Sequence, residues 1–165
     1  TFKVYAGRLT VKDEGSLNGV YVKLSRDMPT ELHPGDIFRI GQEIIRFERI
    51  QSPAPSPDGV ERLGSPCEGV VGRLALVTGR DTTGNAFVVP AHGLHLGRER
   101  GDVIFPEDGY VSGLHCRVAA EGGRVFLTDL GSSNGTYRRL TEEHEVHSGD
   151  VLLMALFGGA ALKKV

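Results

Sequence analysis

The chain has 165 residues, of which 39% are hydrophobic and 24% charged, values typical of a globular protein of about one domain. Its 19 lysines and arginines against 21 aspartates and glutamates give a formal net charge of −2, which excludes a global positive field that would attract nucleic acid or an anionic membrane. The 23 glycines and 8 prolines favour turns, and no long window has a helical apolar stripe, so an all-β fold is predicted.

Short apolar segments bounded by turn residues predict strands along most of the chain. The expected strands cover residues 2–5, 8–11, 38–40, 44–47, 94–96, 116–118 and 124–128. The first two are expected to pair through Ala6-Gly7, and the last follows a glycine-rich hairpin turn at residues 121–123.

A proline- and serine-rich segment divides the chain. Residues 51–59 read QSPAPSPDG, and proline neither propagates a helix nor donates to a strand ladder. We therefore assign residues 51–68 to a linker between a unit at 1–50 and a unit at 69–165.

The two units are related in sequence. Residues 11–21 read VKDEGSLNGVY and residues 127–137 read LTDLGSSNGTY, while residues 31–36 (ELHPGD) match residues 145–150 (EVHSGD). The second unit also has an upstream half that the first unit lacks. Because half a sandwich leaves its inner face and strand edges uncovered, we expect the first unit to be completed by a longer chain or by another copy.

Three motifs of the second unit together resemble the forkhead-associated (FHA) family. They are Gly97-Arg98, residues 111–115 (VSGLH) and residues 129–136 (DLGSSNGT). The resemblance implies an FHA-like β-sandwich of antiparallel and mixed strands at 69–165, preceded by a partial, degenerate second sandwich. It also implies a module that docks phosphothreonine peptides through loops at one end.

The resemblance assigns phosphopeptide binding to four residues: Arg98, Ser112, Ser133 and Asn134. A phosphothreonine carries a charge of about −1.5 to −2 and three acceptor oxygens, which suit arginine, hydroxyl and backbone N–H donors. The same residues also have ordinary interpretations, because an arginine is commonly a solvated surface charge and Asn134-Gly135 alone predicts a type I′ turn.

Support of this site is expected from Gly97, His115, Gly135 and Thr136, with His115 holding the serine loop. A general-base role for His115 is disfavoured, since a Ser/His pair needs an orienting acid and an oxyanion hole of defined geometry, and no Gly-x-Ser-x-Gly elbow is present. Contacts to the peptide flanks are expected from Arg100, Gly113, Arg138 and Arg139. Family members often have arginine where this chain has Gly113, so weaker or altered peptide binding is expected.

The predicted function is therefore phosphorylation-dependent protein binding without catalysis, cofactor or metal. The expected partner is a phosphothreonine-containing protein, such as a Ser/Thr kinase or its substrate, and neither nucleic acid nor a membrane. The alternative is a phosphate-independent scaffold or dimerisation module that self-associates through the incomplete first repeat. With no segment resembling a signal peptide and no apolar run of about 20 residues, we expect a cytoplasmic protein.

Overall fold

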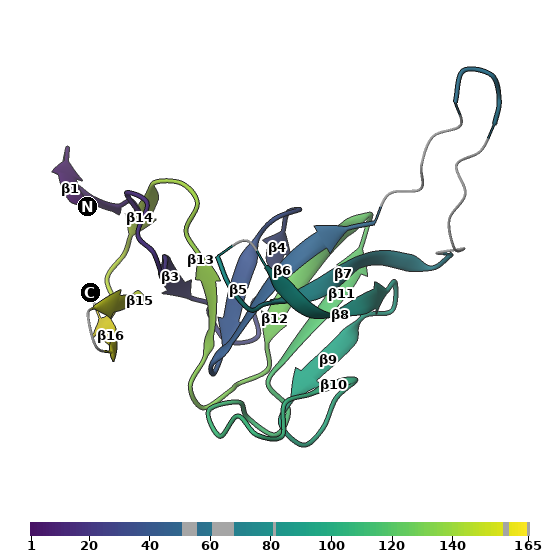
Figure 1. Ribbon diagram of the computed structural model, residues 1–165. Coiled ribbons are helices and arrows are strands. Elements are labelled where there is room, and N and C mark those ends of the chain that lie inside the picture. The colour runs from purple at the N-terminus through teal and green to yellow at the C-terminus, as the bar shows by residue number, and fades with distance from the viewer. Residues whose placement is uncertain (51–55, 61–67, 81, 157–158, 165) are drawn as a thin grey trace.

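The computed structural model describes residues 1–50, 56–60, 68–80, 82–156 and 159–164. Within these ranges all helices and strands that could be assigned are strands, which confirms the all-β prediction. The same ranges contain no helix long and apolar enough to cross a membrane. The strands form an eight-stranded, a five-stranded and a three-stranded sheet (Figure 1).

The three sheets have the following strand orders. The eight-stranded sheet contains β16 (Gly159–Lys164), β15 (Val151–Leu156), β3 (Val20–Lys23), β13 (Thr136–Arg139), β5 (Ile37–Ile40), β6 (Glu43–Arg49), β7 (Val70–Val77) and β8 (Thr83–Pro90). The five-stranded sheet contains β10 (Val103–Ile104), β9 (Leu94–Gly97), β11 (Cys116–Glu121), β12 (Arg124–Asp129) and β4 (Thr30–Leu32). The three-stranded sheet contains β1 (Phe2–Tyr5), β2 (Arg8–Val11) and β14 (His144–Val146).

The strands expected from local pattern are confirmed, including both hairpins. β1 and β2 pair antiparallel around Ala6 and Gly7, whose φ angles are 49° and 76°. β11 and β12 pair around Gly122 and Gly123, at φ 57° and 76°. Two consecutive positive φ values give these turns the twist that a tight hairpin requires.

The two sequence repeats exchange their C-terminal strands. β4 and β5 of the first unit pair with β12 and β13 of the second unit. Reciprocally, β14 and β15 of the second unit pair with β2 and β3 of the first unit. The equivalent strands β3 and β13 pair with each other between these two halves.

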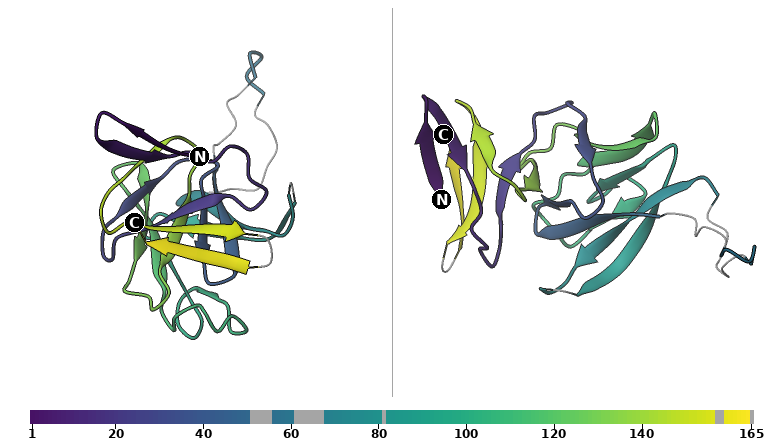
Figure 2. Two further views of the ribbon diagram at one scale, coloured as in Figure 1. Left: turned by 90° about the vertical axis from the view of Figure 1, so that its left-hand side faces the viewer. Right: turned by 90° about the horizontal axis from the view of Figure 1, so that it is seen from above.

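Each packed body therefore contains strands from both sides of the expected linker. One is a two-sheet sandwich built on strands β4 to β13, and the other combines β1 to β3 with β14 to β16. Figure 2 shows the N-terminal strands in purple beside the C-terminal strands in yellow, at one end of the molecule. The division at residues 51–68 describes the repeated sequence, and residues 51–55 and 61–67 of that linker lie outside the described residues.

The main hydrophobic core joins the two units. Phe38 and Phe47 from the first unit are fully buried in one cluster with Leu74, Leu96 and Leu127 from the second. Burial of a large apolar side chain contributes about 1.5–3 kcal/mol. The β5–β6 hairpin is therefore an integral part of the sandwich that carries residues 94–136.

Candidate functional site

Three loops meet at one end of the sandwich: residues 98–102 after β9, 105–115 before β11, and 130–135 between β12 and β13. We call them the loop cluster. The N–H groups of Arg98 and Arg100 donate to the carbonyls of Ser112 and Gly113, at 2.9 and 2.8 Å. The N–H of Leu130 donates to the carbonyl of His115 at 3.0 Å. Backbone hydrogen bonds thus connect all three loops.

Gly97 permits the close approach of the first two loops. A Cβ at this position would collide with the carbonyl oxygens of Arg100 and Gly113. Glycine is needed here for space rather than for its backbone angle, since Gly97 is not among the residues with positive φ.

We expect Gly97→Ala to lower the free energy of unfolding by about 1–3 kcal/mol, the usual cost of overpacking a close contact. Denaturant unfolding measures this change. Gly109→Ala is the matched control, because a Cβ at Gly109 meets nothing within 4 Å. Equal stability of the two variants would show that the loops are not closely packed at Gly97.

Arg98 and Asn134 are both attached to the 105–115 loop. The Arg98 Nη1 donates to the carbonyl of Gly109 at 3.4 Å, and the Asn134 Nδ2 donates to the adjacent carbonyl of Tyr110 at 2.9 Å. The Arg98 Nη2 also lies 2.8 Å from the Glu99 carboxylate, and its side chain is 37% exposed. A cation and an amide from separate loops thus lie over the same segment.

Ser112 and Ser133 are joined directly. The backbone N–H of Ser133 donates to the Ser112 Oγ at 3.0 Å. Because an oxygen can accept this bond and still donate its own hydrogen, the Ser112 hydroxyl keeps a donor for another group. The structure therefore brings Arg98, Ser112, Ser133 and Asn134 together at the exposed rim of the loop cluster.

His115 is completely buried and uses both ring nitrogens structurally. Its Nδ1 accepts the N–H of Ser112 at 3.0 Å, so the proton is on Nε2, which lies 3.1 Å from the carbonyl of Gly135. The neutral ring bridges two loops. With both nitrogens occupied, it has none left to deprotonate the Ser112 hydroxyl.

This geometry predicts a pH dependence of stability. Burial lowers the pKa of His115 below its ordinary value, although the Gly135 carbonyl and the nearby Asp129 and Asp108 oppose the change. The unfolded chain therefore binds this proton first as the pH falls. The contribution of His115 to the free energy of unfolding is complete above about pH 6.5 and is lost as the pH falls toward the folded pKa.

We expect urea unfolding measured from about pH 7.5 to 5.5 to show this loss in the wild type. His115→Gln should be less stable overall but should have a smaller slope with pH. His92→Gln is the control, because His92 is exposed and should leave the slope intact. An unchanged slope in His115→Gln would contradict this account of the buried ring.

A buried carboxylate organises the 130–135 loop. Asp129 accepts hydrogen bonds from the N–H groups of Gly131 and Ser132 at 2.9 and 3.0 Å, and from the hydroxyls of Ser132 and Thr136, each at 2.6 Å. Burial acts to raise the pKa of Asp129, but these bonds outweigh it and hold the pKa below its usual value. The Ser132 Oγ in turn accepts the N–H of Gly135.

The type I′ turn expected at Asn134-Gly135 is not formed. Gly135 has φ 89°, but Asn134 does not have a positive φ, which a type I′ turn requires at both central positions. The bonds of Gly135 to Ser132 and His115 set the loop shape instead.

Sequence reasoning missed Asp129 and Ser132 as organisers of the loop. The repeat carried the signal, because the first unit keeps the equivalent pair Asp13 and Ser16. There, the N–H of Ser16 donates to Asp13 at 2.8 Å, and the N–H of Gly19 donates to the Ser16 Oγ at 3.1 Å.

A second missed feature ties the first unit to the loop cluster. The buried Asp108 accepts the N–H of Gln42 at 2.6 Å and that of Tyr110 at 2.9 Å. A Cβ at Gly41 would lie 2.5 Å from the Asp108 Oδ2 and 2.8 Å from Val111. The β5–β6 turn of the first unit thus braces the 105–115 loop.

Arg100 lies close to Gly113. A Cβ built on Gly113 would lie 3.6 Å from the Glu99 Oε2 and 4.0 Å from the Arg100 Nη2. These are ordinary contact distances, so a side chain at residue 113 has room. The guanidinium of Arg100 therefore lies near the point from which a side chain at residue 113 would extend.

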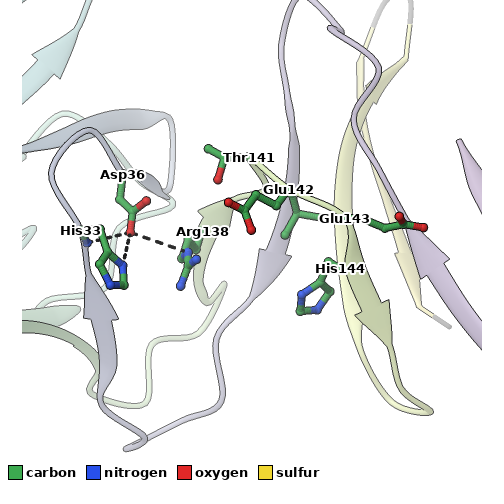
Figure 3. A pocket seen from close by; sticks show the side chains of 8 residues that line it. His33, Asp36, Arg138, Thr141, Glu142, Glu143 and His144 are labelled. Atoms are coloured by element: carbon green, nitrogen blue, oxygen red, sulfur yellow. Dashed lines mark hydrogen bonds and ion pairs between the residues drawn. The ribbon is translucent and has the colours of Figure 1, made fainter.

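Arg138 and Arg139 have other neighbours than the loop cluster. Arg138 points toward Asp36 and His33 (Figure 3), with its Nε 4.0 Å from the Asp36 Oδ2, at a cavity of about 470 Å³. The strand alternates its faces, and Arg139 lines a different cavity. Among described residues, neither guanidinium bonds to the loop cluster, so contact with a peptide flank stays an untested prediction.

No group of three or more histidine, cysteine, aspartate or glutamate side chains with metal-binding geometry occurs within the described ranges.

Comparison with known proteins decides the family. The sequence profile of the FHA domain matches residues 1–41 and 94–155, more than half of the chain. The chain belongs to the FHA family. FHA domains are typically non-catalytic modules that bind phosphothreonine. The two matched segments include both copies of the repeated loop sequence.

The chain is also similar to the glycogen accumulation regulator GarA of Mycolicibacterium smegmatis. The two are 31% identical over 108 residues, which cover 63% of this chain and 68% of GarA. No solved structure matches this FHA chain.

Proposed function

We propose that this FHA chain is a non-catalytic module that binds phosphothreonine peptides at the loop cluster. The observation that carries the proposal is the convergence of Arg98, Ser112, Ser133 and Asn134 on one exposed rim. One guanidinium, two hydroxyls and an amide are the donor types that a phosphorylated peptide needs. The sandwich of strands β4 to β13 presents this site.

Phosphate binding at Arg98 would replace the weak ion pair between Arg98 and Glu99. The Nε and Nη2 atoms of Arg98 lie 3.2 and 2.8 Å from a single Glu99 oxygen. Exposed pairs of this kind contribute about 0–1 kcal/mol. A phosphate dianion makes stronger charge-assisted bonds to a guanidinium, so it can displace Glu99 while Asn134 contacts the peptide backbone.

We further propose that Arg100 supplies the cation absent at Gly113. Arg100→Ala should weaken phosphothreonine-peptide binding about three- to tenfold, less than a fully desolvated ionic bond because Arg100 is exposed. Adding Gly113→Arg to that variant should restore affinity. Fluorescence anisotropy measures both effects, and failure of Gly113→Arg to rescue binding would show that Arg100 does not replace that side chain.

The partner proposed for this site is a phosphothreonine-containing protein, such as a Ser/Thr kinase or a kinase substrate. GarA is by its name a regulator of glycogen accumulation. By analogy with that relative, the chain would act as a regulator, and the proposed site would make this action depend on phosphorylation of the partner.

A peptide-pool experiment tests the proposed function. The full chain is immobilised and exposed to a degenerate phosphothreonine peptide pool and to its unphosphorylated copy. Selective retention of the phosphorylated pool is expected. Equal retention would instead favour the alternative of a phosphate-independent scaffold or dimerisation module, which size measurements of the free chain would then examine.

A further inference from the structure

A second group of arginines surrounds a cavity that the loop cluster does not use. The cavity has a volume of about 790 Å³, within the usual range for small-ligand sites. Its cationic lining consists of Arg39 on β5, Arg46 on β6, Arg80 after β7 and Arg139 on β13. Ser16, Asn18 and Thr78 add hydroxyl and amide groups. Both sequence repeats thus contribute to one basic cavity.

Three of these arginines have no acidic partner among the described residues. Arg46 pairs with Glu48 at 2.7 Å, but no ion pair involves Arg39, Arg80 or Arg139. Arg39 uses only its Nε, which donates to the carbonyl of Gly41 at 2.8 Å. Within the part of the chain that the structure describes, the Nη groups of these three guanidinium ions therefore have no carboxylate partner.

Two carboxylates lie near the cavity. Glu48 bonds to both Arg46 and Arg73, whereas Asp13 accepts the N–H of Ser16 and pairs with no cation among the described residues. No carboxylate belongs to the described lining of the cavity. Gathering like charges around a cavity is unfavourable unless an anion binds among them.

Tyr21 also lines the cavity, and its hydroxyl lies within the electrostatic influence of Arg39 and Arg139. Burial raises the pKa of the Tyr21 hydroxyl. Arg139 and Arg39 both act against this rise, because a cation favours the phenolate, and Asp13 adds to it. Arg139 is further held by packing on the backbone of Gly19, where a Cβ would lie 2.6 Å from its Nε. The two positive groups therefore act on a common point and are positioned by the fold.

We propose that this cavity binds a diphosphate group through Arg39, Arg80 and Arg139. Arginine matches phosphate oxygens with paired donors, and two linked phosphates offer more acceptor oxygens to cations on different strands than a single phosphate does. The group is carried either by free pyrophosphate or by a nucleoside diphosphate. This site is separate from the loop cluster and does not depend on phosphothreonine binding there.

Calorimetric titration of the full chain at low salt tests the proposal, since screening weakens exposed ionic contacts. The probes are pyrophosphate, ADP, AMP and orthophosphate. Pyrophosphate is expected to bind more tightly than orthophosphate. Binding of ADP more tightly than pyrophosphate would identify a nucleotide as the source, and weaker binding of ADP would identify free pyrophosphate. Equal affinity for orthophosphate and pyrophosphate, or no binding of either, would overturn the proposal.

Variants locate the site. Arg39→Gln and Arg139→Gln should each weaken pyrophosphate binding about tenfold or more. Arg124→Gln, an arginine on the five-stranded sheet, is the matched control and should bind as the wild type does. Because Arg39 and Arg139 lie in central strands, Arg80→Gln repeats the test at an exposed turn, with an expected loss of about threefold.

Loss of pyrophosphate binding in Arg98→Ala but not in Arg139→Gln would place the phosphate at the loop cluster and overturn this inference. Conversely, failure to bind phosphothreonine peptides, together with retained pyrophosphate binding that depends on Arg139, would refute only the proposed function. The two proposals can therefore fail separately.

Discussion

Arg98→Ala is expected to weaken binding of a phosphothreonine peptide about ten- to a hundredfold, the equivalent of one charge-assisted bond of about 1.5–3 kcal/mol. The guanidinium of Arg98 is the cation that lies over the Gly109–Tyr110 segment, to which Asn134 also bonds. Its loss removes one of the two arginines, Arg98 and Arg100, that the 98–102 loop brings to the loop cluster. Anisotropy titration with a labelled peptide measures the change.

The matched control is Arg124→Ala. Arg124 is an exposed arginine at the opposite end of β12 from the 130–135 loop, where it pairs with Glu31. Its removal changes the net charge by the same amount without touching the loop cluster. If both variants lose affinity equally, the effect is one of net charge, and the role given to Arg98 is wrong.

Asp129→Ala is expected to lower the free energy of unfolding by about 3 kcal/mol. Asp129 is 3% exposed and accepts four hydrogen bonds from Gly131, Ser132 and Thr136. Removing the carboxylate leaves two N–H groups and two hydroxyls without their acceptor in a partly buried turn. Urea unfolding at neutral pH, where the carboxylate is charged, measures the effect.

The repeat supplies the control for this variant. Asp13 occupies the equivalent position in the first unit but, among the described residues, accepts only the N–H of Ser16, at a more exposed site. Asp13→Ala should therefore cost less than about 1 kcal/mol. A comparable loss in the two variants would mean that the four bonds of Asp129 are not what stabilises its loop.

The strands were predictable because their signal is local. The β1–β2 and β11–β12 hairpins follow from apolar segments on either side of a turn with glycine. The proximity of Arg98, Ser112 and Asn134 is not a local property. It was expected only because the three motifs, taken together, resemble a known family.

The strand exchange could not be predicted from pattern. Residues 31–36 and 145–150 are nearly the same sequence, so β12 can pair with the strand from either repeat without any difference in local preference. The choice depends on packing across the whole sandwich. The hydrogen bond between Gln42 and Asp108 follows from that choice, and no residue spacing in the sequence predicts it.

At Asn134-Gly135, contacts with the rest of the fold override the local preference for a type I′ turn. Asparagine followed by glycine favours a type I′ turn in isolation. Here the Gly135 N–H is bound by Ser132 and its carbonyl lies beside the buried His115. These contacts select the loop shape that points the Ser133 N–H at Ser112.

Amide chemical-shift mapping with a phosphothreonine peptide is the most direct measurement of the central claim. Titration of the labelled chain should shift the amide signals of Arg98, Ser112, Ser133 and Asn134 together and saturably, whereas the unphosphorylated peptide should leave them unchanged. Shifts confined to residues around the arginine-lined cavity, or identical shifts with both peptides, would contradict phosphothreonine recognition by the loop cluster.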